Sequence, residues 1–369
     1  MTSKPVPVIV LAGFLGSGKT TLLNHLLRAS RGTRIGVVVN DFGAIEIDAM
    51  TVAGQLGDST VSLGNGCLCC AVDASELDVF LDRLTRPDAR LDVIVIEASG
   101  LAEPQELVRM VLAGENERVM YGGLVEVVDA AEFDATLERH PEIARHLGIA
   151  DLIVLNKADR VGDAAGERLR ERIRGLGRGA LVSATYGRID PELLFECRPR
   201  GERVGQLSFE DLREEDEDAA GAGDGDRGDG CEVGDGHRHG RAHGDHLHAA
   251  YESVSFTADE PLHPRRLLDF LDSRPEGLYR IKGFVDFGAL DPRNRYAVHA
   301  VGRFLRFHPE PWPAGERRQS GIVLIGSGID TAALRKELDA LPVAGPQDAP
   351  DEHTMWGVLR FVPDGPEGS

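Results

Sequence analysis

A glycine-rich segment near the N-terminus has the residue types and the spacing that bind phosphate. Residues 13–20 read Gly-Phe-Leu-Gly-Ser-Gly-Lys-Thr, which matches the pattern G-x-x-x-x-G-K-[ST]. Glycines allow backbone N–H groups to turn inward around the β- and γ-phosphates, and a following helix N-terminus adds a favourable dipole. Lys19 would supply a positive charge to those phosphates, and the Thr20 hydroxyl would bind Mg²⁺. The nucleotide-binding residues predicted here are Gly13, Gly16, Ser17, Gly18, Lys19, Thr20 and Thr21.

The flanking residues predict the strand and the helix that a phosphate-binding loop requires. Residues 8–11 form a short apolar run typical of a buried strand. Four leucines follow the loop at helical spacing: Leu22, Leu23, Leu26 and Leu27. Because strand, loop and helix occur in this order, the sequence predicts a site for a nucleoside triphosphate, with Lys19 as a catalytic residue.

Two further apolar runs end in side chains suited to the same nucleotide. Residues 93–96 precede Glu97, a candidate catalytic carboxylate that would hold the Mg²⁺ shell or orient the attacking water, and the Gly100 N–H would reach the γ-phosphate. Residues 156–159 read Asn-Lys-Ala-Asp. The Asp159 carboxylate can accept hydrogen bonds from guanine N1–H and N2–H₂, so the pattern favours GTP and disfavours an ATP-dependent small-molecule kinase. The other residues expected around the base are Asn156, Lys157, Ser183 and Ala184.

Three cysteines within four residues form a second group with chemical potential. Cys67, Cys69 and Cys70 lie beside Gly64 and Gly66, which permit the backbone bend that would bring three thiolates to one ion. Thiolates suit Zn²⁺ and, less selectively, Co²⁺, and three of them leave a tetrahedral ion one ligand short. A strained disulfide and a set of buried apolar thiols are the alternatives. Metal binding is the favoured interpretation.

Acidic residues after another apolar strand supply further candidate ligands. Residues 35–39 precede Asn-Asp-Phe-Gly at 40–43. This order places Asp41 at the carboxyl end of a strand, the edge at which ligands bind in open α/β sheets. Asp41 is therefore a candidate catalytic residue and, together with Glu46 and Asp48, a candidate ligand for Mg²⁺ or a transition metal. Solvated loop positions are the alternative for each of these acids.

Composition limits the class of protein. The 369 residues carry a formal net charge of −20, which argues against a nucleic-acid partner and against an anionic-membrane surface. Twelve acids and two arginines between residues 210 and 235 account for half of that charge. No apolar run approaches the roughly 20 residues of a membrane span, and residues 1–7 lack signal-peptide features. We therefore expect a cytoplasmic protein.

Residues 201–250 differ in character from the rest of the chain. Acidic runs, Gly/Asp repeats and a histidine tract follow one another with almost nothing apolar to bury, which predicts an acidic and His-rich disordered linker. Five imidazoles within twelve residues can gather a divalent ion without a fixed fold, and a solvated insert that merely tolerates histidine is the alternative. The candidate ligands are His237, His239, His243, His246 and His248.

The alternation of apolar strands and amphipathic helices predicts an α/β protein. We expect a P-loop NTPase fold with a doubly wound, mainly parallel sheet, followed by a smaller α+β domain. The expected boundaries are residues 1–200 for the nucleotide-binding domain, 201–250 for the linker, 251–345 for the α+β domain and 346–369 for a loose tail. Within the α+β domain residues 296–307 are expected to form a strand, and within the tail residues 355–362 are expected to be ordered.

Taken together, these motifs resemble those of the CobW-type P-loop GTPases, a family of metallochaperones and metal-cofactor assembly proteins related to the urease and hydrogenase maturation GTPases. The resemblance rests on residues 13–20, 40–43, 66–70, 97–104, 156–159 and, in the second domain, 280–284. It covers most of the chain outside the linker and the tail. Many members carry a Glu at the position of Ala44, and here Glu46 is close enough to serve instead.

The resemblance implies a GTPase that converts GTP and water to GDP and phosphate and delivers a transition metal to a client metalloprotein. Intrinsic turnover is expected to be slow, because no internal arginine finger can be assigned. Zn²⁺ is the first choice of metal, because of the thiolates and the histidine tract. Co²⁺ is the second, because the family includes proteins associated with cobalamin synthesis. The alternatives are a cobalt-handling protein of cobalamin synthesis and a GTP-modulated zinc buffer or sensor without a dedicated client. A monomer or a homodimer is expected.

Overall fold

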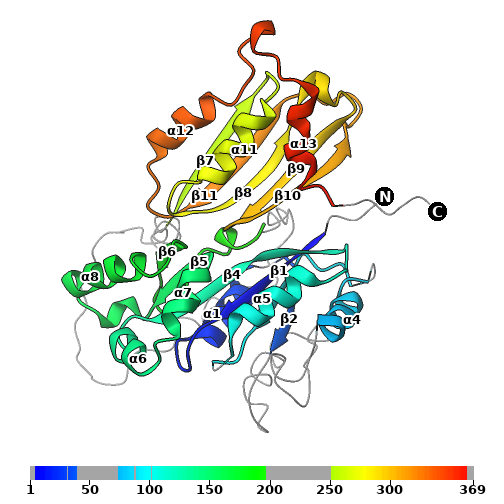
Figure 1. Ribbon diagram of the computed structural model, residues 1–369. Helices are drawn as coiled ribbons and strands as arrows, with labels where there is room; N and C mark the ends of the chain where they lie inside the picture. The colour runs from blue at the N-terminus through cyan, green and yellow to red at the C-terminus, as the bar shows by residue number, and fades with distance from the viewer. Residues whose placement is uncertain are drawn as a thin grey trace, which may run out of the picture.

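Two β-sheets organise the part of the chain that the structure describes. The computed structural model describes residues 5–30, 32–39, 74–86, 89–100, 102–196 and 251–363. The first sheet and its helices lie below the second sheet in Figure 1. The six strands of the first sheet are parallel, and the five strands of the second are antiparallel.

The first sheet has the strand order β2-β3-β1-β4-β5-β6. Its strands are β1 (Val6–Ala12), β2 (Ile35–Val39), β3 (Val93–Glu97), β4 (Val119–Asp129), β5 (Leu152–Asn156) and β6 (Ala180–Ser183). Every residue of β2, β3 and β5 is buried, as expected for parallel strands covered on both faces. After β1 the chain forms β2 and β3 on one side of β1, and it then crosses to form β4 on the other side. The carboxyl end of β1 therefore lies at a topological switch point of the sheet. The predicted doubly wound parallel sheet is confirmed.

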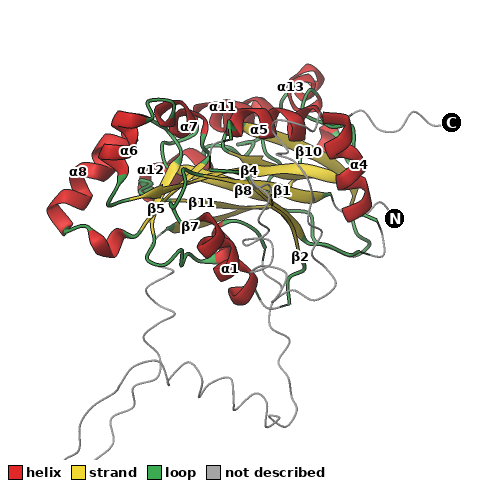
Figure 2. Cartoon of the chain, turned by 90° about the horizontal axis from the view of Figure 1, so that it is seen from below, coloured by secondary structure: helices red, strands yellow, loops and turns green. Residues whose placement is uncertain are grey.

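Helices cover both faces of this sheet (Figure 2). α1 (Lys19–Ala29) lies on one face, with Leu22, Leu23 and Leu26 buried in the core beneath it. The helices on the other face are α4 (Ala74–Leu84), α5 (Pro104–Ala113), α6 (Phe133–Arg139), α7 (Ile143–Ile149) and α8 (Asp163–Arg174). In the ranges that the structure describes, no helix has the length and apolarity to cross a membrane.

The second sheet has the order β10-β9-β8-β11-β7. Its strands are β7 (Glu252–Ala258), β8 (Leu278–Val285), β9 (Asn294–Val301), β10 (Phe304–Pro311) and β11 (Ser320–Gly326), and its helices are α11 (Pro264–Ser273), α12 (Thr331–Asp339) and α13 (Met355–Leu359). Short 3-10 helices occupy Ala158–Arg160, Pro191–Leu193, Gly288–Leu290, Pro346–Asp348 and Glu352–Thr354. The helices α11, α12 and α13 pack on one face of this sheet and form a separate core with it, as expected for an α+β domain.

Two expectations for this region need correction. Residues 296–307 do not form one strand, because Gly302 adopts φ +50° and joins β9 to β10 as a tight hairpin. The part of the expected loose tail that precedes residue 355 contacts α11, and the order expected for residues 355–362 is present. Asp348 pairs with Arg266 of α11, and Met355 and Val358 are buried in the second core.

The two sheets share one core. The side chains of Tyr279, Val301 and Ile325, from the second sheet, lie in the same cluster as the leucines of α1. Gly123 permits this approach, because a Cβ at that position would lie 2.8 Å from Val301 Cγ1. Polar contacts add to the apolar ones: Ser327 Oγ donates to Leu181 O at 2.7 Å. The second sheet is therefore packed against the half of the molecule that contains the first sheet.

Gly302 provides a test of this packing. Its φ of +50° disfavours any other residue, and an added Cβ would lie 1.5 Å from the Asp151 carboxylate of the first half. We expect Gly302→Ala to lower the free energy of unfolding by about 2–4 kcal/mol, measured by urea denaturation. Gly315→Ala is the matched control, because its φ is +80° but nothing lies within 4 Å of the added Cβ. Equal losses for the two variants would show that contact with Asp151 is unimportant.

Candidate functional site: a nucleotide cleft

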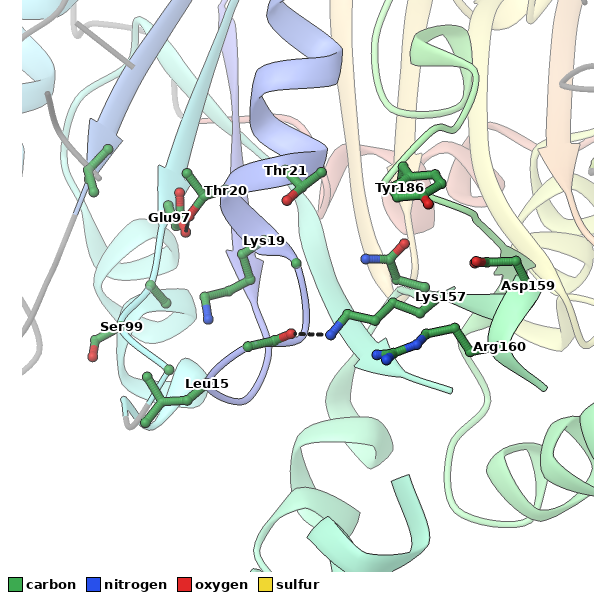
Figure 3. A pocket seen from close by; sticks show the side chains of 16 residues that line it. Leu15, Lys19, Thr20, Thr21, Glu97, Ser99, Lys157, Asp159, Arg160 and Tyr186 are labelled. Atoms are coloured by element: carbon green, nitrogen blue, oxygen red, sulfur yellow. Dashed lines mark hydrogen bonds between the residues drawn. The ribbon is translucent and has the colours of Figure 1, made fainter. Parts of the chain in front are cut away.

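A cleft of about 630 Å³ opens at the carboxyl ends of β1, β3 and β5 (Figure 3). This volume falls in the range of small-molecule sites. It is lined by Leu15, Gly16, Gly18, Lys19, Thr20, Thr21, Val39, Glu97, Ala98, Ser99, Gly100, Asn156, Lys157, Asp159, Arg160 and Tyr186. Segments more than 130 residues apart in the sequence thus meet around one volume.

The loop between β1 and α1 has the backbone that its glycines predict. Gly13 and Gly18 have φ of +145° and +102°. A Cβ at Gly13 would lie 2.3 Å from Val127 O of β4, so the loop lies directly on the neighbouring strand. Ser17 Oγ is buried and has no hydrogen-bond partner in the described part of the chain. The positive φ angles of these glycines give the loop the kind of turn in which backbone N–H groups can bind an oxyanion.

Lys19 begins α1 and lies against the backbone of its own loop. Its Nζ donates to Gly13 O at 2.8 Å and to Phe14 O at 3.4 Å. The side chain is buried, so its charge acts in a less polar environment than water. A cation held at this position is well placed to bind the phosphates of a nucleotide.

Thr20 and Glu97 bring the phosphate loop and β3 together. Thr20 Oγ1 donates to Glu97 Oε1 at 2.8 Å, and both residues line the cleft. A hydroxyl and a carboxylate are hard oxygen ligands of the kind that Mg²⁺ prefers beside nucleotide phosphates. The donor set therefore fits Mg²⁺, with Thr20 and Glu97 as the residues that would hold it.

Asn156 connects three loops of the site. Its Nδ2 donates to Ser17 O at 2.9 Å, and its Oδ1 accepts from Gly187 N at 2.8 Å. Gly18 is required beside it, since a Cβ there would lie 2.2 Å from Asn156 Nδ2. Because Asn156 is buried, both hydrogen bonds are protected from water. The side chain fixes the phosphate loop relative to the loop at residues 185–188.

Lys157 and Asp159 lie at the opposite end of the cleft from Glu97 (Figure 3). Lys157 has φ +59°, and its Nζ contacts Asp129 Oδ2 at 2.6 Å and Gly16 O at 2.8 Å. These contacts extend the lysine stem along the phosphate loop. Asp159 lies beyond it with an exposed carboxylate, where a base that stacks on the stem would present its edge.

The structure adds cleft residues that the sequence motifs did not indicate. They are Leu15, Val39, Ala98, Ser99, Arg160 and Tyr186. Arg160 and Tyr186 lie near Asp159 in Figure 3, and Tyr186 has φ +53° and is 70% exposed. The sequence feature that could have indicated Tyr186 is its position: it is an aromatic residue directly after residues 183–185, the segment expected near the base.

Other predicted site residues do not line the cleft, or they lie outside the residues that the structure describes. Gly13, which lies against Val127 O, and the buried Ser17 do not line the cleft. Ser183 and Ala184 do not line the cleft: Ser183 Oγ accepts from Arg170, and Ala184 O accepts from Ala158 N at 3.1 Å. The residues that lie outside the described ranges are Asp41, Glu46, Asp48, Cys67, Cys69, Cys70, His237, His239, His243, His246 and His248. Among the described residues no group of three His, Cys, Asp or Glu side chains could hold a metal ion.

A parallel sheet with a phosphate loop after its first strand, joined by Glu97 and residues 156–159, defines a P-loop nucleotide-binding protein. Residues 7–183 match the CobW/HypB/UreG nucleotide-binding domain, and residues 251–341 match the cobalamin synthesis protein CobW C-terminal domain. The chain belongs to the CobW/HypB/UreG family of P-loop GTPases.

Two of the relatives described here align with nearly the whole chain, and a third aligns with about half of it. It is 31% identical to the zinc chaperone CobW of Pseudomonas aeruginosa over 91% of this chain and 92% of that protein. It is 28% identical to the zinc chaperone CobW of Sinorhizobium sp, over 91% and 97%. The zinc chaperone YjiA of Escherichia coli is 35% identical over 52% of this chain, and that alignment spans 61% of YjiA.

Proposed function

We propose that this chain is a GTPase that binds a transition metal and delivers it to a client metalloprotein, with Zn²⁺ as the first cargo and Co²⁺ as the second. The observation that carries the proposal is the cleft, in which Lys19, Glu97 and Asp159 surround one volume. Relatives named zinc chaperone support the metal-binding half of the proposal.

GTP would bind with its phosphates in the loop at residues 13–20 and its guanine edge against Asp159. Thr20 and Glu97 would hold Mg²⁺, which neutralises phosphate charge when bound. Glu97 lines the cleft and would also orient the water that attacks the γ-phosphate. Arg160 is the arginine among the described residues that line the cleft, and it lies beside Lys157 and away from Thr20 (Figure 3). Because it is not placed to act as an arginine finger, we infer slow intrinsic turnover.

The cargo would be held by thiolates. Cys67, Cys69 and Cys70 are the proposed ligands, with Asp41 and Glu46 as additional oxygen donors. Val39 lines the cleft and directly precedes the segment that carries all of these residues. A nucleotide-dependent change at Val39 would therefore be transmitted to the metal ligands along a continuous chain, so that loss of the γ-phosphate weakens metal binding.

The test is a chelator competition with Zn²⁺ and with Co²⁺ on apo, GDP-bound and non-hydrolysable-GTP-bound protein. We expect affinity to rise at least about tenfold with the GTP analogue and to be lost when Cys67, Cys69 and Cys70 are all replaced by Ser. Cys197→Ser is the matched control. The better-retained ion is the leading cargo.

Two other outcomes would contradict the proposal. Metal affinity that is the same in all three nucleotide states would disprove the coupling. Binding that survives the triple Ser variant but disappears when residues 230–250 are deleted would instead identify a metal buffer based on the histidine tract, the alternative that five histidines within twelve residues favour.

A further inference from the structure

The last residue of β4 carries a carboxylate that contacts the base end of the cleft from outside its lining. Asp129 is the register partner of Asn156, the last residue of β5, and Ala130 N donates to Asn156 O at 2.9 Å. Because the two strands end side by side, Lys157, the next residue after β5, begins beside Asp129. Lys157 Nζ lies 2.6 Å from Asp129 Oδ2. A residue that belongs to no sequence motif therefore contacts the segment at residues 156–159 directly.

The ion pair between Asp129 and Lys157 is well defined. Asp129 Oδ1 accepts from Ala131 N at 3.0 Å, which orients the carboxylate and leaves Oδ2 to the lysine. The two side chains are only 13% and 29% exposed, so their attraction is screened less than that of a surface pair. Asp134 and Arg172 form such a surface pair, with side chains that are 65% and 49% exposed.

Lys157 has a backbone conformation that its contacts must maintain. Its φ of +59° is uncommon for a residue other than glycine, asparagine or aspartate, and such conformations persist where the surrounding structure determines them. Nζ contacts both Asp129 Oδ2 and Gly16 O, at 2.6 and 2.8 Å. Figure 3 shows the stem extending toward the phosphate loop, with Asp159 at the other end. The two contacts thus set the direction of the stem.

This direction leaves Asp159 available. The Asp159 carboxylate is exposed in the cleft and has no hydrogen bond or ion pair with any residue that the structure describes. A lysine ammonium is a compact charge on a flexible stem, so without a fixed partner it would compete for a carboxylate two residues away. That pairing would occupy the oxygens proposed to receive the guanine edge. It would also move the stem away from the position in which a base can stack on it.

We propose that Asp129 is a positioning residue for base recognition: it holds Lys157 Nζ against the phosphate loop, so that the lysine stem can stack on guanine and Asp159 stays free. This inference rests on the proposed binding of GTP in the cleft. Asp129 itself touches no part of the nucleotide and acts through Lys157. Its loss therefore weakens the contribution of the base and leaves the binding of the phosphates unchanged.

Asp129→Asn is expected to lower the affinity for Mg²⁺–GDP about tenfold, the size of coupling that contacting groups show. The Asn amide keeps the shape of the side chain and a carbonyl acceptor for Ala131 N. Mg²⁺–tripolyphosphate, which has no base, should bind with an affinity within about twofold of wild type. In steady-state hydrolysis of GTP the variant should raise KM and leave kcat unchanged, because the interaction lost is made equally in the ground state and in the transition state.

The experiment is a double-mutant cycle on the full chain, with the affinities for Mg²⁺–GDP and Mg²⁺–tripolyphosphate measured by isothermal titration. Lys157→Met keeps an unbranched apolar stem and removes the ammonium. In that background Asp129→Asn should change GDP affinity by less than about twofold, because the group on which Asp129 acts is gone. Asp129→Glu keeps the charge and moves it by one methylene, so its loss should be smaller than that of Asp129→Asn and should also disappear beside Lys157→Met. Asp134→Asn, which breaks the surface pair with Arg172, is the matched control and should behave as wild type.

The outcomes separate this inference from the function on which it rests. Equal GDP affinities in wild type and Asp129→Asn would overturn the role of Asp129 and leave the nucleotide site intact. An equal loss for GDP and tripolyphosphate would show that Asp129 organises the phosphate loop and not the base site. A loss that persists beside Lys157→Met would show that Asp129 does not act through the lysine. Absence of GTP and GDP binding by wild type would overturn the nucleotide site itself. If Asp129→Asn does not fold, Asp129→Glu and its cycle with Lys157→Met decide the question.

Discussion

Replacement of Asp159 by Asn is expected to change the base preference of the cleft from guanine to xanthine. In the proposed orientation the carboxylate would accept hydrogen bonds from guanine N1–H and N2–H₂, whereas an Asn amide would place its own NH₂ group against the guanine NH₂. Xanthine carries a carbonyl at that position and would accept from the amide. Since a polar pocket left with unmatched donors rejects its ligand strongly, GTP affinity should fall by about 1000-fold or more.

Competition against a fluorescent nucleotide would measure this change with GTP, XTP and ATP in parallel. Asp163→Asn, at the exposed start of α8, is the control and should leave all three affinities unchanged. If Asp159→Asn binds GTP as wild type does, the guanine edge does not lie against residues 156–159. The orientation proposed for the nucleotide in the cleft would then be wrong.

Lys19→Ala is expected to reduce GTP hydrolysis by about 100- to 1000-fold, because it removes the positive charge that would stabilise the transferring phosphoryl group. Nucleotide binding should weaken less than hydrolysis, since the backbone N–H groups of the loop and the guanine contacts remain. Single-turnover phosphate release measures the chemical step directly. Lys336→Ala on the exposed side of α12 controls for loss of a lysine charge elsewhere. Hydrolysis within tenfold of wild type would place the phosphates away from Lys19.

The phosphate loop was fully predictable from sequence, and the physical reason is local. Phosphates are bound by the backbone of one continuous segment, so the spacing of Gly13, Gly18 and Lys19 is sufficient to indicate the site. The same holds for the parallel sheet. Its buried strands are apolar runs, and each is followed by a helix or loop of recognisable pattern.

The arrangement of the cleft around that loop was only partly predictable. Residues 156–159 indicated guanine, but nothing in their spacing showed that Asn156 would bind both Ser17 O and Gly187 N. Tyr186 and Arg160 carry no motif and became visible as lining residues when the strands were assembled. Ser183 and Ala184 were expected near the base from their position along the chain, and the structure places them at the end of β6 and directly after it, outside the cleft lining.

The metal ligands remain a sequence prediction. Cys67, Cys69 and Cys70 were singled out by their density and by the softness of thiolates, which are properties of the residues themselves. Their segment lies outside the described residues, and it begins where β2 ends at Val39. The chelator competition is therefore the measurement on which the metal half of the proposed function depends.

By itself the sequence determined the class of this protein, because strands, helices and a phosphate loop are specified by contacts between residues close together in the chain. The tertiary structure decided how the second sheet packs beside α1, where the hairpin turns at Gly302, and that Glu126 is buried within the first sheet. Each of these depends on contacts between segments about a hundred or more residues apart, or on a turn that interrupts an apolar run. The spacing of residues along the chain does not encode such contacts, whereas packing and the exclusion of water do.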